Sequence, residues 1–436
     1  MASRTLSIGI VGLGTVGTGV IRLIEENAML IARRSGQTIS IGAITARDRN
    51  KDRGVDLRGY RWVDDMLEMA DDPELDIIVE LIGGSDGPAL TLAKKALTNG
   101  KSLVTANKAM IAHHGLELAE LAETNGAALH YEAAVAGGIP AIKGVREGTA
   151  ANRIERIYGI LNGTSNYILS TMETSGRDFD DVLAEAQALG YAEADPSFDI
   201  DGVDAAHKLS ILASLAFASR LDFDAVATEG IRAIQAADIA QADALGYRIR
   251  LLGLAERHDG DKASELFQRV HPYLVPKSHP LANVDGSTNA VVAEGNFSGR
   301  LLFQGAGAGD GPTASAVVAD IIAIARGELS PAFAMPVKAL EPCAPAESGH
   351  RIGRAYLRFQ VADKPGVLAE ITAALRDADV SIESLIQKER SPNDAVLVAM
   401  VTHECAESQV NATLDALAGS SSLLGEPMVI HILGDE

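Results

Sequence analysis

The sequence predicts an α/β protein of three units, which its length and two patterns of strand and helix signals support. A chain of 436 residues corresponds to about three domains at roughly 150 residues each. Residues 1–135 alternate apolar strand-like runs with amphipathic helical segments, which is typical of a doubly wound, mainly parallel sheet. Residues 351–436 contain, from 354 to 433, the order strand, helix, strand, strand, helix, strand of a small ferredoxin-like domain.

The predicted elements follow one another along the chain. In the first unit, strand-like runs lie at 6–11, 39–45, 76–81 and 102–105, and helical periodicity covers 15–34 and 88–99. Unit 136–311 opens at a glycine-rich turn, and its mixed signals predict an α+β unit. Its strand-like runs are 154–160, 248–255 and 266–270, the last two antiparallel, and its helical segments lie around Tyr167 and at 180–189 and 203–219.

Two segments lie between the middle unit and the C-terminal unit. A helix is predicted over 312–326, with Pro312 near its start, where a missing N–H costs least. Residues 327–350 hold four prolines and show little periodicity, which indicates a linker.

Composition excludes several classes of protein. Hydrophobic residues make up 47% of the chain, too many for a disordered protein. The 38 basic and 59 acidic side chains give a formal net charge of −21. Such a chain repels phosphate backbones at long range, so we expect no nucleic-acid partner. A small anionic ligand stays open, because a local positive site can exist within a negative molecule.

Cysteine usage and hydropathy predict a soluble, cytoplasmic protein with no membrane partner. Cys343 and Cys405 are the two cysteines of the sequence, too few for a disulfide framework, and they fit a reducing compartment. The first residues lack the pattern of a signal peptide. No run of eighteen apolar residues offers a membrane span.

A glycine-rich turn after the first strand predicts a dinucleotide site. The sequence GLGTVG comprises Gly12, Leu13, Gly14, Thr15, Val16 and Gly17. It follows an apolar strand and opens a helix, the context in which backbone N–H groups and the positive helix end bind a pyrophosphate. We therefore expect a Rossmann-type unit. The alternative is a glycine-rich connection that binds nothing.

The residues after the second strand favour NADP(H) over NAD(H). Arg47 stands near the position that contacts the adenosine ribose, and Arg49 and Lys51 add positive charge. A guanidinium there would pair with a 2′-phosphate. Asp48 is adjacent and keeps NAD(H) open, and an ordinary solvated turn is the third interpretation.

Two further clusters carry reactive side chains. Lys108 follows a buried strand and begins a helix, at the sheet edge where ligands gather; the alternative is a surface lysine. The segment from Glu193 to Asp204 holds five carboxylates within twelve residues, two or three of which could converge on an ammonium group. Lys208 is one helical turn after Asp204, either as a solvated ion pair or as a proton-exchanging group.

Together these motifs resemble homoserine dehydrogenase with a C-terminal ACT domain, over essentially the whole chain. The motifs are GLGTVG (12–17), TANK (105–108), EAAVAGGIP (132–140), NGTSN (162–166), GYAEADPSFDIDGVDAAHK (190–208), HPLANVDGSTNAV (279–291) and GAGAGDGPTASAVVAD (305–320). The resemblance implies reversible NAD(P)H-dependent reduction of L-aspartate 4-semialdehyde to L-homoserine in threonine, methionine and isoleucine biosynthesis. It also implies that helix 312–326 completes the nucleotide unit and that 136–311 is the catalytic and dimerisation unit.

The resemblance assigns roles to individual residues. Lys208 would donate the proton to the substrate oxygen and Lys108 would hold or protonate substrate near the nicotinamide, with the choice between the two lysines open. Glu193 and Asp199 would bind the substrate amino group, and Asp204 would orient the site. Gly309 and Thr313 would complete the cofactor cleft. Asn162, Gly163 and Thr164 would line a hinge, or simply cap a helix.

The resemblance also implies a cation and an effector. Glu132, Val135, Gly137 and Ile139 match a monovalent-cation site for Na⁺ or K⁺; a bare turn is the alternative. The effector motif D-x-P-G-x-L supplies Asp363, Gly366, Val367 and Leu368, and implies feedback by L-threonine in a homodimer or homotetramer. Some ACT domains serve only in assembly.

Two other functions are consistent with parts of the sequence. A phosphorylating semialdehyde dehydrogenase would need a nucleophilic cysteine beside a histidine, and neither Cys343 nor Cys405 lies in a suitable region. A non-catalytic amino-acid sensor that keeps the nucleotide fold and the ACT domain is the other candidate, and it would not need the five charged residues Lys108, Glu193, Asp199, Asp204 and Lys208 together. The length also argues against a version fused to an aspartokinase.

Overall fold

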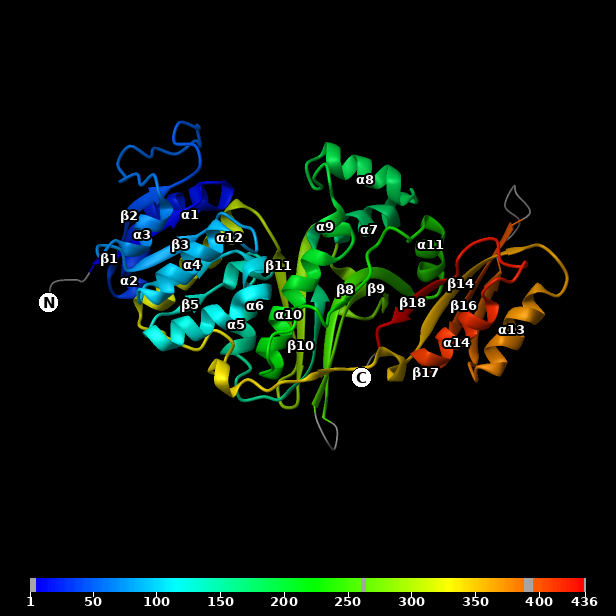
Figure 1. Cartoon of the computed structure of the whole chain (residues 1–436). Helices are drawn as coiled ribbons and strands as arrows, with labels where there is room; N and C mark the ends of the chain where they lie inside the picture. Colours follow the sequence, from blue (N-terminus) through cyan, green and yellow to red (C-terminus); the bar gives the residue numbers. More distant parts are fainter. Residues whose placement is uncertain (1–4, 260–263, 388–394, 435–436) are drawn as a thin grey trace.

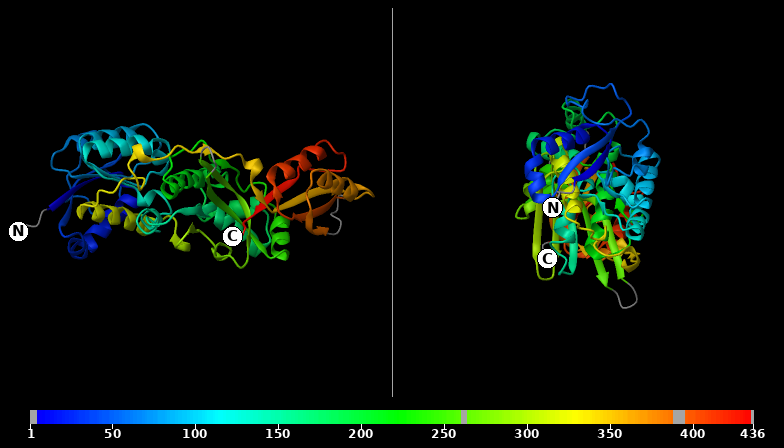
Figure 2. Two further views of the ribbon diagram at one scale, coloured as in Figure 1. Left: turned by 90° about the horizontal axis from the view of Figure 1, so that it is seen from below. Right: turned by 90° about the vertical axis from the view of Figure 1, so that its left-hand side faces the viewer.

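The computed structural model describes residues 5–259, 264–387 and 395–434 and shows an elongated molecule of three lobes. The lobes follow the chain from the N-terminal lobe to the C-terminal lobe (Figure 1). Seen from below, the molecule has the same long axis, and the end-on view looks along it (Figure 2). Within the described residues, no helix is both long and apolar enough to cross a membrane.

The first lobe is the predicted parallel sheet with helices on its faces. Its strand order is β2-β1-β3-β4-β5, and every neighbouring pair is parallel. The strands are β1 (Thr5–Val11), β2 (Thr38–Thr45), β3 (Ile77–Glu80), β4 (Ser102–Thr105) and β5 (Leu129–His130), and the helices are α1 (Thr15–Glu26), α2 (Ala28–Ser35), α3 (Met66–Asp71), α4 (Pro88–Thr98) and α5 (Lys108–Asn125). β3 and β4 are buried along their whole length, as expected for strands covered on both faces.

One predicted helix is two helices in the structure. The periodicity of residues 15–34 predicts a single helix, but α1 ends before Asn27 and α2 begins after it. Asn27 leaves the helical conformation, with φ −108° and ψ 19°. The asparagine side chain competes for backbone hydrogen bonds and so favours helix ends. The spacing of apolar residues alone does not reveal such a break.

A helix from far along the chain packs into the first lobe. α12 (Asp310–Ala325) lies beside α1. A Cβ at Gly19 of α1 would lie 3.1 Å from the backbone oxygen of Asp310 and 3.2 Å from Cβ of Ala314, so the two helices approach each other closely here. Arg22 of α1 also forms an ion pair with Asp310.

The other two lobes share one large sheet. Its strand order is β11-β10-β6-β8-β9-β18-β14-β16-β15, with β7 and β12 also paired to β9. The strands are β6 (Ile154–Ile160), β7 (Ala227–Thr228), β8 (Tyr247–Asp259), β9 (Ser264–Pro276), β10 (Thr288–Gly295), β11 (Gly299–Ala306), β12 (Ala344–Pro345), β14 (Ala355–Ala362), β15 (Ile382–Gln387), β16 (Ala395–Thr402) and β18 (Met428–Ile432), and β13 (Ile352–Gly353) pairs with β17 (Cys405–Ala406). β8 and β9 are antiparallel, as predicted.

The helices of these two lobes differ in how deeply they are buried. They are α6 (Ala141–Arg146), α7 (Gly163–Ser175), α8 (Phe179–Ala188), α9 (Ser197–Ile200), α10 (Val203–Phe217), α11 (Ala236–Ala244), α13 (Val367–Asp377) and α14 (Glu407–Leu417), with short 3₁₀ turns at Glu132–Ala134, Pro280–Asn283, Val337–Ala339 and Ser348–His350. α7, α10 and α11 pack on strands of the sheet, and α8 packs on α7. α10 is buried on nearly all sides, as its apolar sequence requires, and so its charged residues lie inside the molecule.

The C-terminal lobe has the predicted ferredoxin-like order. β14, α13, β15, β16, α14 and β18 follow one another, and the four strands lie antiparallel in the order β18-β14-β16-β15. β18 also pairs in parallel with β9, through His431 with Tyr273 and Ile432 with Leu274. The periodicity of separate strands does not specify this junction between lobes.

The predicted linker is packed along the molecule, and we call residues 327–350 the strap. Phe333, Val337 and Leu340 are buried. Glu341 forms a bridge with Ser219, and β12 pairs with β9. Figure 1 shows the strap running from the first lobe toward the C-terminal lobe. Its buried side chains have no regular spacing, because the strap crosses several elements in turn.

Candidate active site

Three loops of the first lobe meet at the carboxyl end of the parallel sheet. Val11, Glu80 and Thr105 lie side by side as the last residues of β1, β3 and β4. The glycine turn, the loop after β3 and the start of α5 therefore face the same side. The chain goes from β1 out to β2 and returns to β3 on the other side of β1, which is the switch point where such sheets bind ligands.

The three glycines of the nucleotide turn have different surroundings. Gly12 has φ +100°, and a Cβ there would lie 2.6 Å from the carbonyl oxygen of Leu81. A Cβ at Gly17 would lie 2.1 Å from the carbonyl oxygen of Gly12. A Cβ at Gly14 would have nothing within 4 Å. Gly12 and Gly17 thus permit close packing, while Gly14 leaves the start of α1 open to a ligand. Leu13 is buried, Thr15 exposed and Val16 half-buried.

The basic loop after β2 is braced by an arginine that sequence reasoning missed. Arg53 donates from Nε to the carbonyl of Leu13 at 3.0 Å, from Nη1 to that of Lys51 at 2.7 Å, and from Nη2 to that of Asp48. Arg47 is exposed beside this brace. Arg53 stands in a stretch without periodicity, so no sequence signal distinguished it from its neighbours.

Asp204 joins the two predicted lysines. Its Oδ1 lies 3.0 Å from Nζ of Lys108 on α5, and its Oδ2 lies 2.7 Å from Nζ of Lys208 on α10. The Lys208 ammonium also donates to the carbonyl of Leu161 at 2.6 Å. Burial by itself would raise the pKa of Asp204, but Lys208 and Lys108 hold that pKa well below its usual range. The site therefore contains one carboxylate between two ammonium groups.

Asn162 connects this cluster to a second carboxylate. Its Oδ1 accepts from the N–H of Ser165 at 2.8 Å, so it caps α7. Its Nδ2 donates to Oδ1 of Asp199 at 2.7 Å and to Oδ2 of Asp204 at 2.8 Å. The structure therefore confirms that this motif caps a helix, and its role in a hinge stays a prediction. Gly163 begins α7, and Thr164 donates to the carbonyl of Tyr191.

The acidic segment separates into parts with different surroundings. Asp199 and Asp204 share Asn162, whereas Asp201 pairs with Arg232 and Asp195 accepts from the N–H of Ser197. Glu193 is exposed and lies outside this network. Of the two residues predicted to bind the amino group, Asp199 therefore lies in this network beside Asp204, and Glu193 does not.

Aromatic and imidazole rings surround the lysine side of the cluster, and sequence reasoning missed most of them. Nζ of Lys108 lies 5.6 Å from the centre of the Phe198 ring. Nε2 of His207 lies 3.2 Å from Nε2 of His113, and Phe223 stacks on His207. Burial, together with His113 and Lys108, lowers the pKa of His207 to about 4. A neutral imidazole therefore stands next to Lys208 in the chain.

The predicted cation residues form a tight buried turn. The carboxylate of Glu132 accepts from the N–H groups of Ile142 and Lys143, each at 2.9 Å. Burial and the nearby Asp320 carboxylate raise the pKa of Glu132 to about 7. Val135, Gly137 and Ile139 are buried close by in the chain, and a Cβ at Gly137 would lie 2.3 Å from the carbonyl oxygen of Gly307.

The remaining predicted residues lie in two places. Gly309, with φ +127°, precedes α12, and Thr313 is buried in its first turn. In the C-terminal lobe Gly366 has φ +99° and caps α13, Val367 is buried and Asp363 is exposed; Leu368 is half-buried beside them. This loop belongs to a different lobe from Lys108 and Lys208 (Figure 1).

Comparison with known proteins identifies the family. Family models match residues 12–132 (homoserine dehydrogenase, NAD binding domain), 140–322 (homoserine dehydrogenase) and 355–419 (ACT domain). A homoserine dehydrogenase of Pseudomonas aeruginosa is 48% identical over 430 residues, covering 96% of this chain and 97% of its own. The chain belongs to the homoserine dehydrogenase family. It is therefore an NAD(P)-dependent oxidoreductase of amino-acid biosynthesis.

Solved homoserine dehydrogenases share the fold. The structure of the Thiobacillus denitrificans enzyme has a TM-score of 0.92 and 42% identity, covering 99% of both chains. A hyperthermophilic archaeal homoserine dehydrogenase in complex with NADPH has a TM-score of 0.61 and 28% identity, covering 73% of this chain and 97% of its own. The predicted fold class and family are both confirmed.

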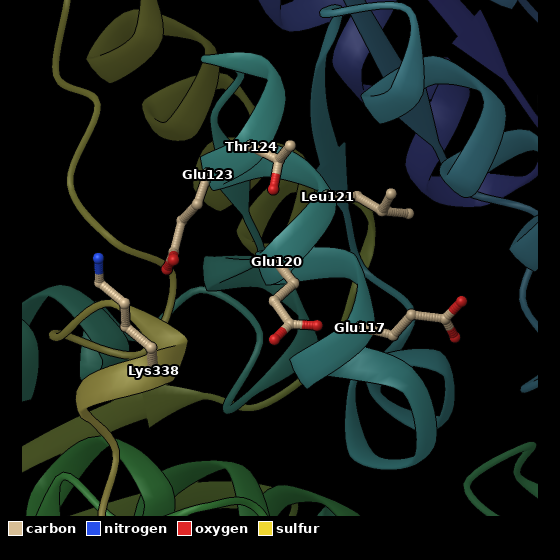
Figure 3. Close-up of a pocket in the computed structure, with 6 residues that line it drawn as sticks. All are labelled: Glu117, Glu120, Leu121, Glu123, Thr124 and Lys338. Atoms are coloured by element: carbon tan, nitrogen blue, oxygen red, sulfur yellow. The ribbon is translucent and has the colours of Figure 1, made fainter.

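One cavity of the described residues lies away from the Lys108–Asp204–Lys208 cluster. It has a volume of about 500 Å³ and is lined by Glu117, Glu120, Leu121, Glu123, Thr124 and Lys338. Figure 3 shows Lys338 on the strap across from Glu123 on α5. The other five residues belong to the second half of α5, whereas Lys108 begins that helix, so this cavity is not the candidate site.

Proposed function

We propose that this chain interconverts L-aspartate 4-semialdehyde and L-homoserine at the Lys108–Asp204–Lys208 cluster. The observation that carries the proposal is the placement of two ammonium groups on one buried carboxylate, beside the carboxyl end of the parallel sheet. A carbonyl oxygen that becomes an alkoxide needs positive charge and a proton donor. Lysines held by Asp204 supply both.

In this mechanism Lys208 donates the proton to the aldehyde oxygen, and Lys108 holds that oxygen. Asp204 keeps both ammonium groups charged and oriented. When bound, the nicotinamide nucleotide supplies the hydride, which goes to the aldehyde carbon. In the reverse direction Lys208 takes the hydroxyl proton back, so the same residues serve both directions.

The substrate amino group is assigned to the acidic side of the cluster. Asp199 is half-buried, and the Asn162 amide holds one of its oxygens. An ammonium group that leaves water needs such an anionic partner. Glu193 belongs to the same proposal, and its exposed side chain has to turn inward when substrate binds.

The proposed nucleotide is NADP(H). Arg47, Arg49 and Lys51 lie on the loop that Arg53 ties to Leu13 of the nucleotide turn, so their charge has a fixed position relative to that turn. Gly309 and Thr313 belong to the nucleotide cleft in the same proposal. The nucleotide unit is then 1–135 with helix 312–326, and the catalytic and dimerisation unit is 136–311.

We also infer a Na⁺ or K⁺ site at Glu132 with carbonyl oxygens of Val135, Gly137 and Ile139. The residues fit a cation because the Glu132 carboxylate is buried and its pKa is raised, while the Lys143 ammonium lies on Asp320 instead, at 3.0 Å. A bound cation would offset the buried negative charge of Glu132 and would hold the turn between the lobes in place.

Feedback by L-threonine through residues 351–436, in a homodimer or homotetramer, completes the proposal. The loop at Asp363, Gly366, Val367 and Leu368 would take the effector. Of the two edges of the C-terminal sheet, β18 is already paired with β9. Pairing between two copies of this sheet would therefore use the β15 edge.

The test is oxidation of L-homoserine at alkaline pH, followed by nicotinamide absorbance. We expect turnover with both nucleotides and a higher kcat/KM with NADP⁺, and faster turnover in Na⁺ or K⁺ salts than in a choline salt. No turnover with either nucleotide would contradict the proposed reaction. Equal kcat/KM values with NADP⁺ and NAD⁺ would contradict the proposed role of Arg47. Equal rates in Na⁺, K⁺ and choline salts would contradict the proposed cation site.

A further inference from the structure

A buried carboxylate at the end of β3 has no role in the proposed chemistry so far. Glu80 is 0% exposed. Its Oε1 accepts from the N–H groups of Ile82 at 2.7 Å and Gly83 at 3.1 Å, and its Oε2 accepts from Oγ1 of Thr105 at 2.6 Å. These bonds join the loop after β3 to the end of β4.

Three donors are directed at the carboxyl oxygens of Glu80. Both N–H groups can only donate, and Oγ1 of Thr105 accepts from the N–H of Asn107 at 3.0 Å while it donates its own proton to Glu80. The side chain is therefore held in one position at the end of the sheet.

The charge of Glu80 has no cationic partner among the side chains in the described part of the chain. No lysine, arginine or histidine there lies within ion-pair distance of it, and Lys108 is paired with Asp204 instead. A buried charge of one sign is costly unless something compensates it. The three hydrogen bonds offset part of this cost. A cationic group of a bound ligand would offset more of it.

Glu80 stands where the nicotinamide half of a nucleotide is expected. It lies in register between Val11, which precedes the nucleotide turn, and Thr105, which is three residues before Lys108. The turn after β1 holds the pyrophosphate and the end of β2 faces the adenosine. The nicotinamide is then on the β3 and β4 side of the switch point.

We propose that Glu80 stabilises the positive charge of the oxidised nicotinamide through space and so binds NAD(P)⁺ in preference to NAD(P)H. This inference rests on the use of a nicotinamide nucleotide by the chain. Transfer of a hydride to the aldehyde carbon leaves one positive charge on the ring, while the proton on the oxygen comes from the protein. Glu80 therefore favours the charge distribution that develops during aldehyde reduction.

Neutralising Glu80 tests the proposal by binding rather than turnover. In the full-length chain, the ratio of Kd for NAD(P)⁺ to Kd for NAD(P)H should rise in Glu80→Gln on the order of tenfold, the effect of one charge at about 10 Å in a protein interior. Nucleotide fluorescence and calorimetry measure the two constants. An unchanged ratio in a folded Glu80→Gln protein would overturn the proposal.

Thr105→Val is the matched control, because it removes the two hydrogen bonds of the Thr105 hydroxyl, to Glu80 and from Asn107, and keeps the charge of Glu80. It should weaken both nucleotides alike and leave the ratio unchanged. If Thr105→Val moved the ratio as far as Glu80→Gln, the role of Glu80 would be structural and the proposal wrong.

The wild-type protein supplies a second measurement that does not depend on the folding of a variant. A benzamide analogue of the oxidised nucleotide has the same shape with a neutral ring. The wild type should bind the cationic nucleotide several-fold more tightly than this analogue. Equal affinities would overturn the proposal, whereas failure of both to bind would instead contradict the nucleotide site itself.

Discussion

At the residue scale, the candidate chemistry depends on how Asp204 is shared. One of its oxygens serves Lys108 and the other serves both Lys208 and Asn162. Removing a partner from such a buried group is costly, because the charge left behind has lost its compensation. The proton donor is therefore best tested by a substitution that leaves Asp204 paired with Lys108.

Lys208→Ala is expected to lower turnover by roughly 10²- to 10⁴-fold, the usual contribution of general acid–base catalysis. Nucleotide affinity should persist, because the turn at Gly12 is untouched and Lys108 still pairs with Asp204. Steady-state rates and nucleotide titrations measure the two effects.

Lys94→Ala is the control for Lys208→Ala. It removes a surface lysine that pairs with Glu117 on α5, and both rate and affinity should stay at wild-type values. A Lys208→Ala protein with the wild-type rate would show that another group donates the proton.

At the element scale, the turn between β1 and α1 combines two requirements in one short motif. Gly12 and Gly17 are required by contacts within the protein, since a Cβ at either would meet a backbone carbonyl. Gly14 has an ordinary negative φ of −79° and open space around it. No contact within the described part of the protein requires glycine at this position, and we propose that the approaching ligand does.

We expect Gly14→Ala to fold with wild-type stability and to raise the Kd for the nucleotide, because the added methyl group occupies space that the pyrophosphate approaches. Gly17→Ala should also unfold at lower temperature, since its Cβ would lie 2.1 Å from the carbonyl oxygen of Gly12. Thermal unfolding and nucleotide titration separate the two effects.

Gly59→Ala serves as the neutral comparison for the turn. A Cβ at Gly59 has nothing within 4 Å, and the residue lies in a loop outside the turn, so neither stability nor affinity should change. Wild-type affinity in Gly14→Ala would show that the turn does not approach the phosphates.

At the scale of the whole molecule, the C-terminal lobe is joined through β9 to α10, the helix that carries Asp204 and Lys208. Arg269 of β9 donates to both oxygens of Glu407 on α14, at 2.9 and 2.6 Å. The next residue, Val270, packs on Gly202, where a Cβ would lie 3.1 Å from its Cγ1. Gly202 precedes α10 and is two residues before Asp204. Deleting the C-terminal lobe would therefore unpair β18 from β9 and leave Arg269 without Glu407.

A point substitution tests the proposed effector loop without opening this junction. Gly366→Ala should raise the L-threonine concentration that gives half-inhibition, because the left-handed φ of +99° strains any side chain there and the loop must shift. Inhibition curves of the full-length enzyme measure the change.

Gly419→Ala carries the same kind of backbone strain elsewhere in the lobe, with φ +80° and open space. It should lose about 1–2 kcal/mol of stability, as Gly366→Ala does, with an unchanged response to threonine. If both variants lost the response equally, the motif would act through stability alone. A wild-type enzyme that threonine does not inhibit would exclude the effector.

The sequence by itself determined the fold class, the family and the residues of the cluster. Strand and helix periods are local properties, glycine turns have local geometry, and the i, i+4 spacing of Asp204 and Lys208 places them on one helix face. What only the tertiary structure decided concerns partners far apart in the chain. Such partners are Lys108 on Asp204, Arg53 on the nucleotide turn, Glu80 on Thr105 and β18 on β9. Each of these contacts depends on how separate elements pack, and no local period encodes that packing.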